Sequence, residues 1–301
     1  MRVIGFWALS VSAVVGIGTV AAQPTPDFTN AIFGKSVIYS QTAGNAPVLS
    51  GNNPYRFNVL VWGLSSPSSG NYSITDGTLT GASSGSYTLP SPAGGNGIFT
   101  DGSIVGVNYQ HTFPKFATQA SLDAAFPAGN YTLKFNTIDG INPTFGLLLP
   151  AVQLPAVQYP GTPDITNLAS LQSADANGPV TVNWSGFTDG SASDFVRLVV
   201  ADSSGNPIYQ SPLPGQTGAL NGLSTSATLP AGILAPGETY MGELDFVQFL
   251  NSDFSTYAGA EVQDFYSSGV HFDISTPEPY AMTMVALGLV GLLFLPRRRR
   301  A

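Results

Sequence analysis

The chain has 301 residues and a formal net charge of −8, so its surface repels phosphate backbones and we expect no nucleic-acid partner. It contains no cysteine, which excludes disulfides, thiolate metal sites and a cysteine nucleophile. Glycine (34) and proline (23) are frequent, charged residues make up only 9% and aromatic residues 11%, a balance typical of many short strands joined by turns around a closed core.

The first twenty-two residues carry the pattern of an export signal. A basic residue precedes an apolar run over 3–20, and small residues occupy positions 20 and 22, as signal peptidases require. We predict a signal peptide over 1–22 with cleavage between Ala22 and Gln23. An uncleaved N-terminal anchor is the alternative, although prolines follow at once and disfavour a longer helix.

Residues 23–150 are expected to form a first β domain. Alternation at 131–135 predicts that Tyr131, Leu133 and Phe135 face inward while the residues between them face water. The dipeptide at 76–77, Asp-Gly, favours a tight hairpin turn between two short strands. Further strands are expected at 36–41, 55–64 and 144–149.

Residues 164–275 are expected to form a second β domain behind a proline-punctuated linker over 151–163. Strands are expected at 180–184, 195–201, 207–210, 226–229, 240–246 and 270–274. The last of these strands closes the domain just before residue 276.

An early tryptophan and a late tyrosine recur in the two halves. Trp184 lies on an early expected strand, and Tyr240 follows a Pro-Gly turn at the start of a late strand. Trp62 and Tyr131 occupy corresponding places. This pattern resembles fibronectin type III and immunoglobulin-like sandwiches, in which the tryptophan packs in the core and the tyrosine forms a corner bond. We expect an all-β protein with two tandem antiparallel β-sandwiches, and one larger sandwich or jelly roll is the alternative.

The last residues, 276–301, have three elements in a fixed order. Pro277, Glu278 and Pro279 precede an apolar run over 280–295, and Arg297, Arg298, Arg299 and Arg300 follow it. This order resembles the PEP-CTERM sorting tail of exported bacterial proteins. The resemblance implies export, transient anchoring in the inner membrane and cleavage near the Pro-Glu-Pro by an exosortase-type membrane protease. It also implies release to the cell surface or an exopolysaccharide matrix, and it implies no catalytic activity.

The physical properties of the tail agree with that resemblance. Sixteen residues at about 1.5 Å per residue make a helix of roughly 24 Å, slightly short of a hydrocarbon core of roughly 30 Å. We therefore expect one marginal transmembrane helix over 280–295. The arginine cluster belongs on the cytoplasmic side, which places the body outside the cytoplasm. An anchor that is never cleaved is the alternative.

Few residues suggest chemistry. His111 and His271 each stand alone on a β-like run, and solitary strand histidines are usually surface residues. Asp189 and Asp194 flank a small polar loop, but the loop lacks the ligand spacing of a calcium site, so a solvated turn is favoured. We expect no metal, no cofactor and no enzymatic activity.

Three acids lie close together in the sequence: Glu238, Glu243 and Asp245. The last two share the outward face of the strand that carries Tyr240, where paired acids could serve glycoside hydrolysis but more simply keep a sheet soluble. Loose candidates for sugar stacking are Tyr55, Tyr72 and Tyr87. The sequence thus predicts an exported structural or adhesive protein of a surface or matrix. An exported carbohydrate-binding protein or glycoside hydrolase is the alternative.

Overall fold

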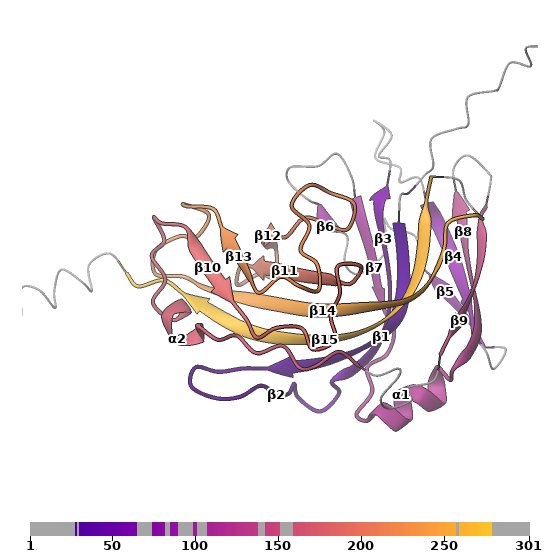
Figure 1. The fold of residues 1–301 in the computed structure, drawn as a ribbon, viewed down its shortest axis with the longest axis horizontal. Coiled ribbons are helices and arrows are strands. Elements are labelled where there is room, and N and C mark those ends of the chain that lie inside the picture. The colour runs from indigo at the N-terminus through magenta and orange to yellow at the C-terminus, as the bar shows by residue number, and fades with distance from the viewer. Residues whose placement is uncertain are drawn as a thin grey trace, which may run out of the picture.

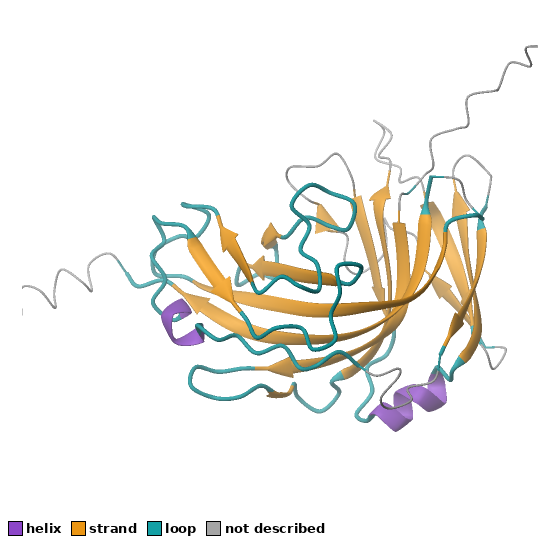
Figure 2. Cartoon of the chain, in the orientation of Figure 1, coloured by secondary structure: helices purple, strands orange, loops and turns teal. Residues whose placement is uncertain are grey.

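The computed structural model describes Phe28 and residues 30–64, 74–81, 85–89, 99–100, 107–137, 142–150, 159–256 and 259–278. These residues form an all-β protein with two short helices (Figures 1 and 2). The strands of the first half are β1 (Asn30–Ser40), β2 (Val48–Leu49), β3 (Tyr55–Leu64), β4 (Ile74–Thr80), β5 (Ser86–Leu89), β6 (Phe99–Thr100), β7 (Val107–Thr112), β8 (Gly129–Thr137) and β9 (Thr144–Leu149). The second half contains β10 (Val180–Asn183), β11 (Phe195–Ala201), β12 (Pro207–Gln210), β13 (Ser226–Leu229), β14 (Thr239–Asp253) and β15 (Glu261–Ser275). The helices are α1 (Gln119–Ala125) and α2 (Leu168–Leu171).

A nine-stranded sheet joins the two halves. Its order is β12-β11-β14-β15-β1-β3-β7-β6, with β2 paired to β1. The last strand, β15, runs parallel to β1 from Asn30 opposite Glu261 to Ser40 opposite His271. Strands from residues 23–150 and from residues 164–275 therefore belong to the same main sheet, whereas in two tandem sandwiches each domain would have sheets of its own. This sharing follows from the length of β14 and β15, which are 15 residues each and reach across the molecule (Figure 1).

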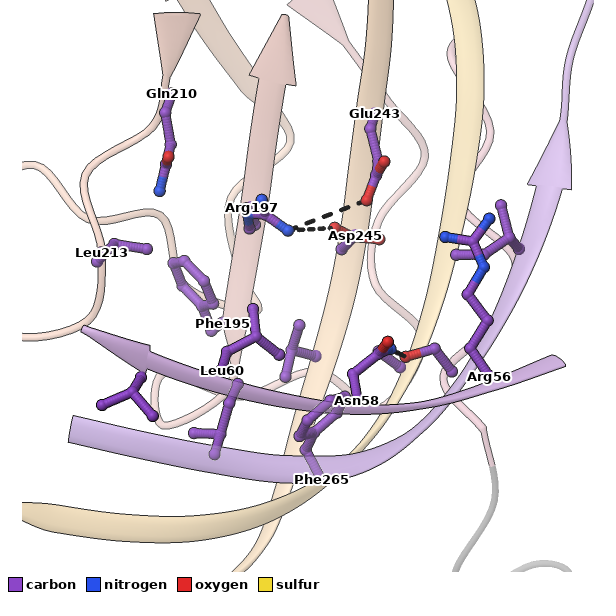
Figure 3. A pocket seen from close by; sticks show the side chains of 16 residues that line it. Arg56, Asn58, Leu60, Phe195, Arg197, Gln210, Leu213, Glu243, Asp245 and Phe265 are labelled. Atoms are coloured by element: carbon purple, nitrogen blue, oxygen red, sulfur yellow. Dashed lines mark hydrogen bonds and ion pairs between the residues drawn. The ribbon is translucent and has the colours of Figure 1, made fainter. Parts of the chain in front are cut away.

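The two faces of the nine-stranded sheet differ because side chains alternate along each strand. On one face, residues such as Leu244 and Val270 pack into apolar cores. The four-stranded sheet β5-β4-β8-β9 covers one end of this face, and the pair β10-β13 covers the other. The opposite face carries Glu243 and Asp245 and lines a cavity (Figure 3).

The first core is rich in aromatic rings. The Phe57 ring stacks on Phe126 with centroids 4.1 Å apart and also contacts Phe33, Phe113 and Tyr131. Tyr131, Leu133 and Phe135 are all buried, as their alternation predicts. The helix α1 closes one edge, where the buried Lys35 ammonium pairs with Asp123 at 2.5 Å. This helix forms over a stretch for which the sequence predicted no helix, and Thr118 caps it.

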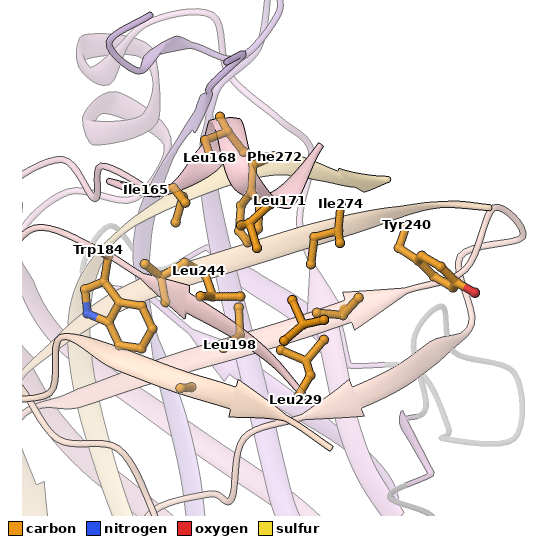
Figure 4. Close-up of a cluster of buried hydrophobic side chains, with 14 of the residues drawn as sticks. Ile165, Leu168, Leu171, Trp184, Leu198, Leu229, Tyr240, Leu244, Phe272 and Ile274 are labelled. Atoms are coloured by element: carbon orange, nitrogen blue, oxygen red, sulfur yellow. The ribbon is translucent and has the colours of Figure 1, made fainter. Parts of the chain in front are cut away.

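The second core is mainly aliphatic and holds Trp184 (Figure 4). The Trp184 indole is buried and donates a hydrogen bond to the Ser224 carbonyl at 2.8 Å. The Tyr240 hydroxyl accepts a hydrogen bond from the Ala235 amide at 2.7 Å, and the Tyr131 hydroxyl donates one to the Pro127 carbonyl at 2.7 Å. The predicted corner bonds are confirmed in both halves.

The turn signal at 76–77 lies inside a strand. Asp76 and Gly77 belong to β4 and pair there with Asn136 and Phe135 of β8, so the predicted hairpin turn is wrong. A Cβ at position 77 would lie 2.7 Å from the Lys134 carbonyl oxygen, so this glycine serves a close approach between strands instead of a turn. The predicted start of the last strand is also wrong, because β15 begins at Glu261, nine residues before the expected strand at 270–274.

Several predictions fall outside the described residues. They include the signal peptide over 1–22 with its cleavage point, most of the linker over 151–163, and the tail from Pro279 onward. Within the described ranges, neither helix is long and apolar enough to cross a membrane. Pro277 and Glu278 are described and are exposed directly after β15.

Candidate functional site

A band of charged side chains crosses the face of the nine-stranded sheet that lies opposite the two cores. Arg197 on β11 lies opposite Asp245 on β14, and Glu243 lies opposite His271 on β15. Arg56 lies on β3 at the other side of β1. Three strands separate β3 from β11, yet Arg56 and Arg197 line the same two cavities. The sheet must therefore curl around this face, which brings distant strands together.

The four groups on β11, β14 and β15 form one network of ion pairs and hydrogen bonds. The Arg197 Nη1 atom lies 3.5 Å from the Asp245 Oδ2 atom and 3.9 Å from the Glu243 Oε1 atom. The His271 Nε2 atom lies 3.0 Å from the Glu243 Oε2 atom. Figure 3 shows the two contacts of Arg197 side by side. Glu243 is therefore held from two sides by cationic groups.

A glycine makes room for the Asp245 carboxylate. Gly269 lies opposite Asp245 on β15, and a Cβ at this position would collide with the Asp245 carboxylate and lie 3.0 Å from the Ile38 Cδ1 atom. The Asp245 side chain thus lies flat across the neighbouring strand. Only a residue without a side chain allows this, which explains a glycine in the middle of β15.

The network separates the acid strengths of its two carboxyl groups. Burial and repulsion by Glu243 raise the pKa of Asp245 to about 8. Burial would also raise the pKa of Glu243, but the hydrogen bond with His271 and the charges of Arg197 and Arg56 lower it to about 2. Although burial opposes its charge, the contact with Glu243 raises the pKa of His271. Near neutral pH, Glu243 is therefore charged and Asp245 holds a proton, and the contact with Glu243 raises the pKa of His271 and so favours its charged form.

Two buried polar atoms at this face have no partner among the described residues: the Arg56 Nε donor and the Asn58 Oδ1 acceptor. The Asn58 side chain is 7% exposed, and its amide donates to the Ser36 hydroxyl at 2.8 Å. Ser267 in turn donates to Ser36 at 2.7 Å. A buried polar group without a partner costs free energy, so such atoms usually mark a water or ligand position.

Two adjoining cavities lie at these atoms. The first has a volume of about 60 Å³ and is bordered by Asn58, Ser36 and Ser267, by apolar side chains of several strands, and by Leu213 in the loop after β12. The second has a volume of about 160 Å³. Both are lined by Arg56, Arg197 and Glu243, which form the wall between them.

Several residues that the sequence singled out lie in environments other than those predicted. Glu243 and Asp245 do face away from Tyr240, but they lie on an interior strand and are largely buried, so they do not serve as a solubilising edge. Glu238 is exposed in the turn before β14. His271 is half-buried in the network and is not a free surface residue. His111 lies on β7 opposite Val59 and outside the network, and its side chain is not among those described.

The remaining candidates have structural roles. The Asp194 carboxylate accepts hydrogen bonds from the Ser191 amide at 2.8 Å and the Phe249 amide at 3.3 Å, which fixes a turn, while Asp189 is exposed. No group of three metal-ligating side chains occurs in the described part of the chain. Tyr55 and Tyr87 pack against the first core and are not exposed platforms, and Tyr72 lies outside the described residues.

Comparison with known proteins identifies no family. No family model and no curated protein matches the chain. Among solved structures, the FN1-FN3 domains of chicken CNTN1 give a TM-score of 0.23 at 11% identity, covering 84% of this chain and 66% of that one. The BSP domain of a biofilm associated protein gives 0.19 at 16% identity, covering 74% and 27%. Murine CEACAM1b gives 0.20 at 12% identity, covering 82% and 99%. Likenesses this weak carry no functional argument, so the site is interpreted from its own geometry.

Sequence reasoning missed the basic members of the site. Arg56 and Arg197 are two of only 10 basic residues in the chain, and each alternates with apolar neighbours on a strand that is otherwise suited to a core. A charged residue inside such a strand needs a partner when it is buried. That signal could have indicated an internal ion-pair network, although not its members.

Proposed function

We propose that this protein is a non-enzymatic structural or adhesive module of a cell surface or extracellular matrix, delivered through its PEP-CTERM tail. One observation carries the proposal: β15, the strand that leads into the tail, is an interior strand of the largest sheet. It ends at Ser275, and the exposed Pro277 and Glu278 follow after a single residue. A protease would therefore find Pro277 and Glu278 at the surface of a folded body.

The connection to β15 suits an anchored protein. A pull on the tail acts along β15, which is hydrogen-bonded to β14 on one side and to β1 on the other. The Thr276 hydroxyl donates a hydrogen bond to the Ala235 carbonyl at 2.6 Å and accepts one from the Glu238 amide at 3.1 Å. Many hydrogen bonds along both flanks then resist such a pull together, and the body stays folded while it is attached.

The proposed route has three steps. A signal peptidase cleaves between Ala22 and Gln23, the apolar run over 280–295 anchors the body in the inner membrane, and Arg297, Arg298, Arg299 and Arg300 stay in the cytoplasm. An exosortase-type membrane protease then cleaves near Pro277, Glu278 and Pro279. The released body joins the cell surface or an exopolysaccharide matrix.

Glycoside hydrolysis, the second candidate, gains little support from its best residues. Glu243 and Asp245 share a hydrogen bond, whereas glycosidases keep their two carboxyl groups about 5 Å or more apart to admit the reacting sugar carbon or water. Carbohydrate binding without turnover remains compatible with the proposed function. The geometry therefore favours a binding or structural role over hydrolysis.

The test is the mass and location of the processed chain in a bacterium that has an exosortase. We expect a mature form that begins at Gln23 and ends near Pro279, recovered from the cell surface or medium. A variant lacking Arg297, Arg298, Arg299 and Arg300 should change in retention or processing, while a Lys134→Met variant, altered at an exposed cation of the body, should not. Recovery of the uncleaved chain from the cytosol would overturn the proposal.

A further inference from the structure

The cavity at Arg56 and Asn58 has features of a built binding site. Arg56 presents a buried Nε donor without an acceptor, and Asn58 presents a buried Oδ1 acceptor without a donor among the described residues. Both side chains line the same cavity of about 60 Å³. A space of this size exceeds what a single water molecule occupies, which is about 10–15 Å³ on a comparable measure.

We infer that this cavity binds a carboxylate that carries a neighbouring hydroxyl group, the combination found in uronic acids and other sugar acids. The carboxylate supplies the acceptor that the Arg56 guanidinium lacks, in the planar geometry that guanidinium groups bind best. The hydroxyl supplies the donor that Asn58 Oδ1 lacks. The inference goes beyond the proposed function and does not depend on the sorting tail.

The charge of the surrounding groups favours an anion. The charged and titratable side chains facing the cavity and its wall are Arg56 on β3, Arg197 on β11, Glu243 and Asp245 on β14, and His271 beside Glu243 on β15. The guanidinium groups of Arg56 and Arg197 are cationic. Since the pKa of Asp245 is raised and that of His271 is also raised, positive charge exceeds negative charge there near neutral pH. Such an excess is notable in a chain whose net charge is −8.

The arrangement also discriminates between anions and neutral sugars. A neutral sugar can satisfy Asn58 but brings no charge to Arg56. A simple carboxylate such as acetate satisfies Arg56 and leaves Asn58 without a donor. The adjoining cavity of about 160 Å³, which shares Arg56, Arg197 and Glu243, provides room for the rest of a sugar ring.

The test is calorimetric titration of the full-length chain, purified in mild detergent, with galacturonate, acetate, galactose and a short oligogalacturonate. We expect galacturonate to bind at least tenfold more tightly than acetate and galactose not to bind. Binding should weaken as the pH rises through about 8, because Asp245 loses its proton there and adds negative charge beside the cavity. Equal affinity for galactose and galacturonate, or no binding of either, would overturn the inference.

Two variants at one position separate charge from geometry. Arg56→Met removes the guanidinium and keeps the apolar stem, so galacturonate binding should fall at least tenfold. Arg56→Lys keeps the positive charge but lacks the Nε donor, so its affinity for galacturonate should lie between those of the parent and Arg56→Met. The matched control is Lys134→Met, which removes an exposed cation on β8 and should leave binding unchanged. If Arg56→Met binds as tightly as the parent chain, the cavity is not the site.

The oligogalacturonate arm identifies the source of the carboxylate. Binding of both monomer and oligomer supports an acidic polysaccharide as the ligand. Binding of the monomer alone supports a free sugar acid in the same cavity. The comparison of galacturonate with galactose uses the parent protein alone. It therefore tests the inference even if Arg56→Met fails to fold.

Discussion

The first and second cores close against the same sheet with different side chains. The first core is a network of rings in which Phe57 alone contacts Phe33, Phe113, Phe126 and Tyr131. The second core is mainly aliphatic, with a single stacked pair of described rings, Phe187 on Phe246 at 4.8 Å. In an aromatic network one side chain supports many neighbours, whereas in an aliphatic core the burial is spread over many small contributions.

The largest expected difference between the cores comes from deleting one central side chain in each. Phe57→Ala should lower the free energy of unfolding by about 3–5 kcal/mol, because it removes a fully buried ring and leaves a cavity among rigid neighbours. Leu198→Ala, at a fully buried position of the second core, should cost about 2–4 kcal/mol. Chemical denaturation of both variants measures the difference. If Leu198→Ala costs more, the aromatic network is not the tighter core.

A buried charge distinguishes the first core further. Lys35 is 2% exposed, and burial lowers its pKa despite the contact with Asp123. Asp123→Ala leaves this ammonium buried without its anion and should cost about 3 kcal/mol at pH 7. The loss should shrink at high pH, where Lys35 gives up its proton. Adding Lys35→Met should recover most of the stability, and a double variant as unstable as Asp123→Ala would contradict this.

Asp264 gives the first core a pH dependence. The side chain is 0% exposed, and burial raises its pKa to about 6, although hydrogen bonds from Asn251 oppose the rise. Because the folded pKa lies above the unfolded one, this group favours the folded state below about pH 4 and loses that contribution as the pH rises through 6. Asp264→Asn should therefore gain up to about 3 kcal/mol relative to the parent between pH 4 and pH 8. A difference between the two proteins that is independent of pH would refute this assignment.

The smallest expected effects concern the corner bonds, which the two halves share. Tyr131→Phe and Tyr240→Phe each remove one hydrogen bond to the backbone and should cost about 1 kcal/mol. Tyr131 donates its hydrogen bond and Tyr240 accepts its own. Similar losses in the free energy of unfolding would show that the two bonds stabilise the fold equally despite this difference. A loss near zero at either position would mean that water replaces the corner bond.

Local patterns predicted the strands well but not their connection. Alternation at 131–135 and the corner tyrosines follow from sequence because they depend on neighbouring residues. The continuity of β15 does not, since Ser267, Ser268 and Gly269 have the composition of a turn. These small residues are required in the middle of the strand, where the Asp245 carboxylate lies across Gly269 and Ser267 bonds to Ser36.

The candidate site was only partly predictable for the same reason. The sequence correctly predicted which face of the strand carries Glu243 and Asp245, since both face away from Tyr240. Their negative charge is balanced by Arg56 and Arg197, which lie about 140 residues apart in sequence and line the same cavities only because the sheet curls. Contacts between strands so far apart in the chain leave no periodic signal.

The shared sheet is tested most directly by a cross-link between β1 and β15. Ser36 and Ser267 are register partners with their hydroxyl oxygens 2.7 Å apart, and the chain has no cysteine to compete. The Ser36→Cys, Ser267→Cys double variant should form an intramolecular disulfide under mild oxidation, seen as a faster band on a non-reducing gel. A Ser36→Cys, Ser268→Cys variant, whose second thiol points to the other face, should not. If neither pair links in the folded protein, the first and last strands are not neighbours and the two halves do not share a sheet.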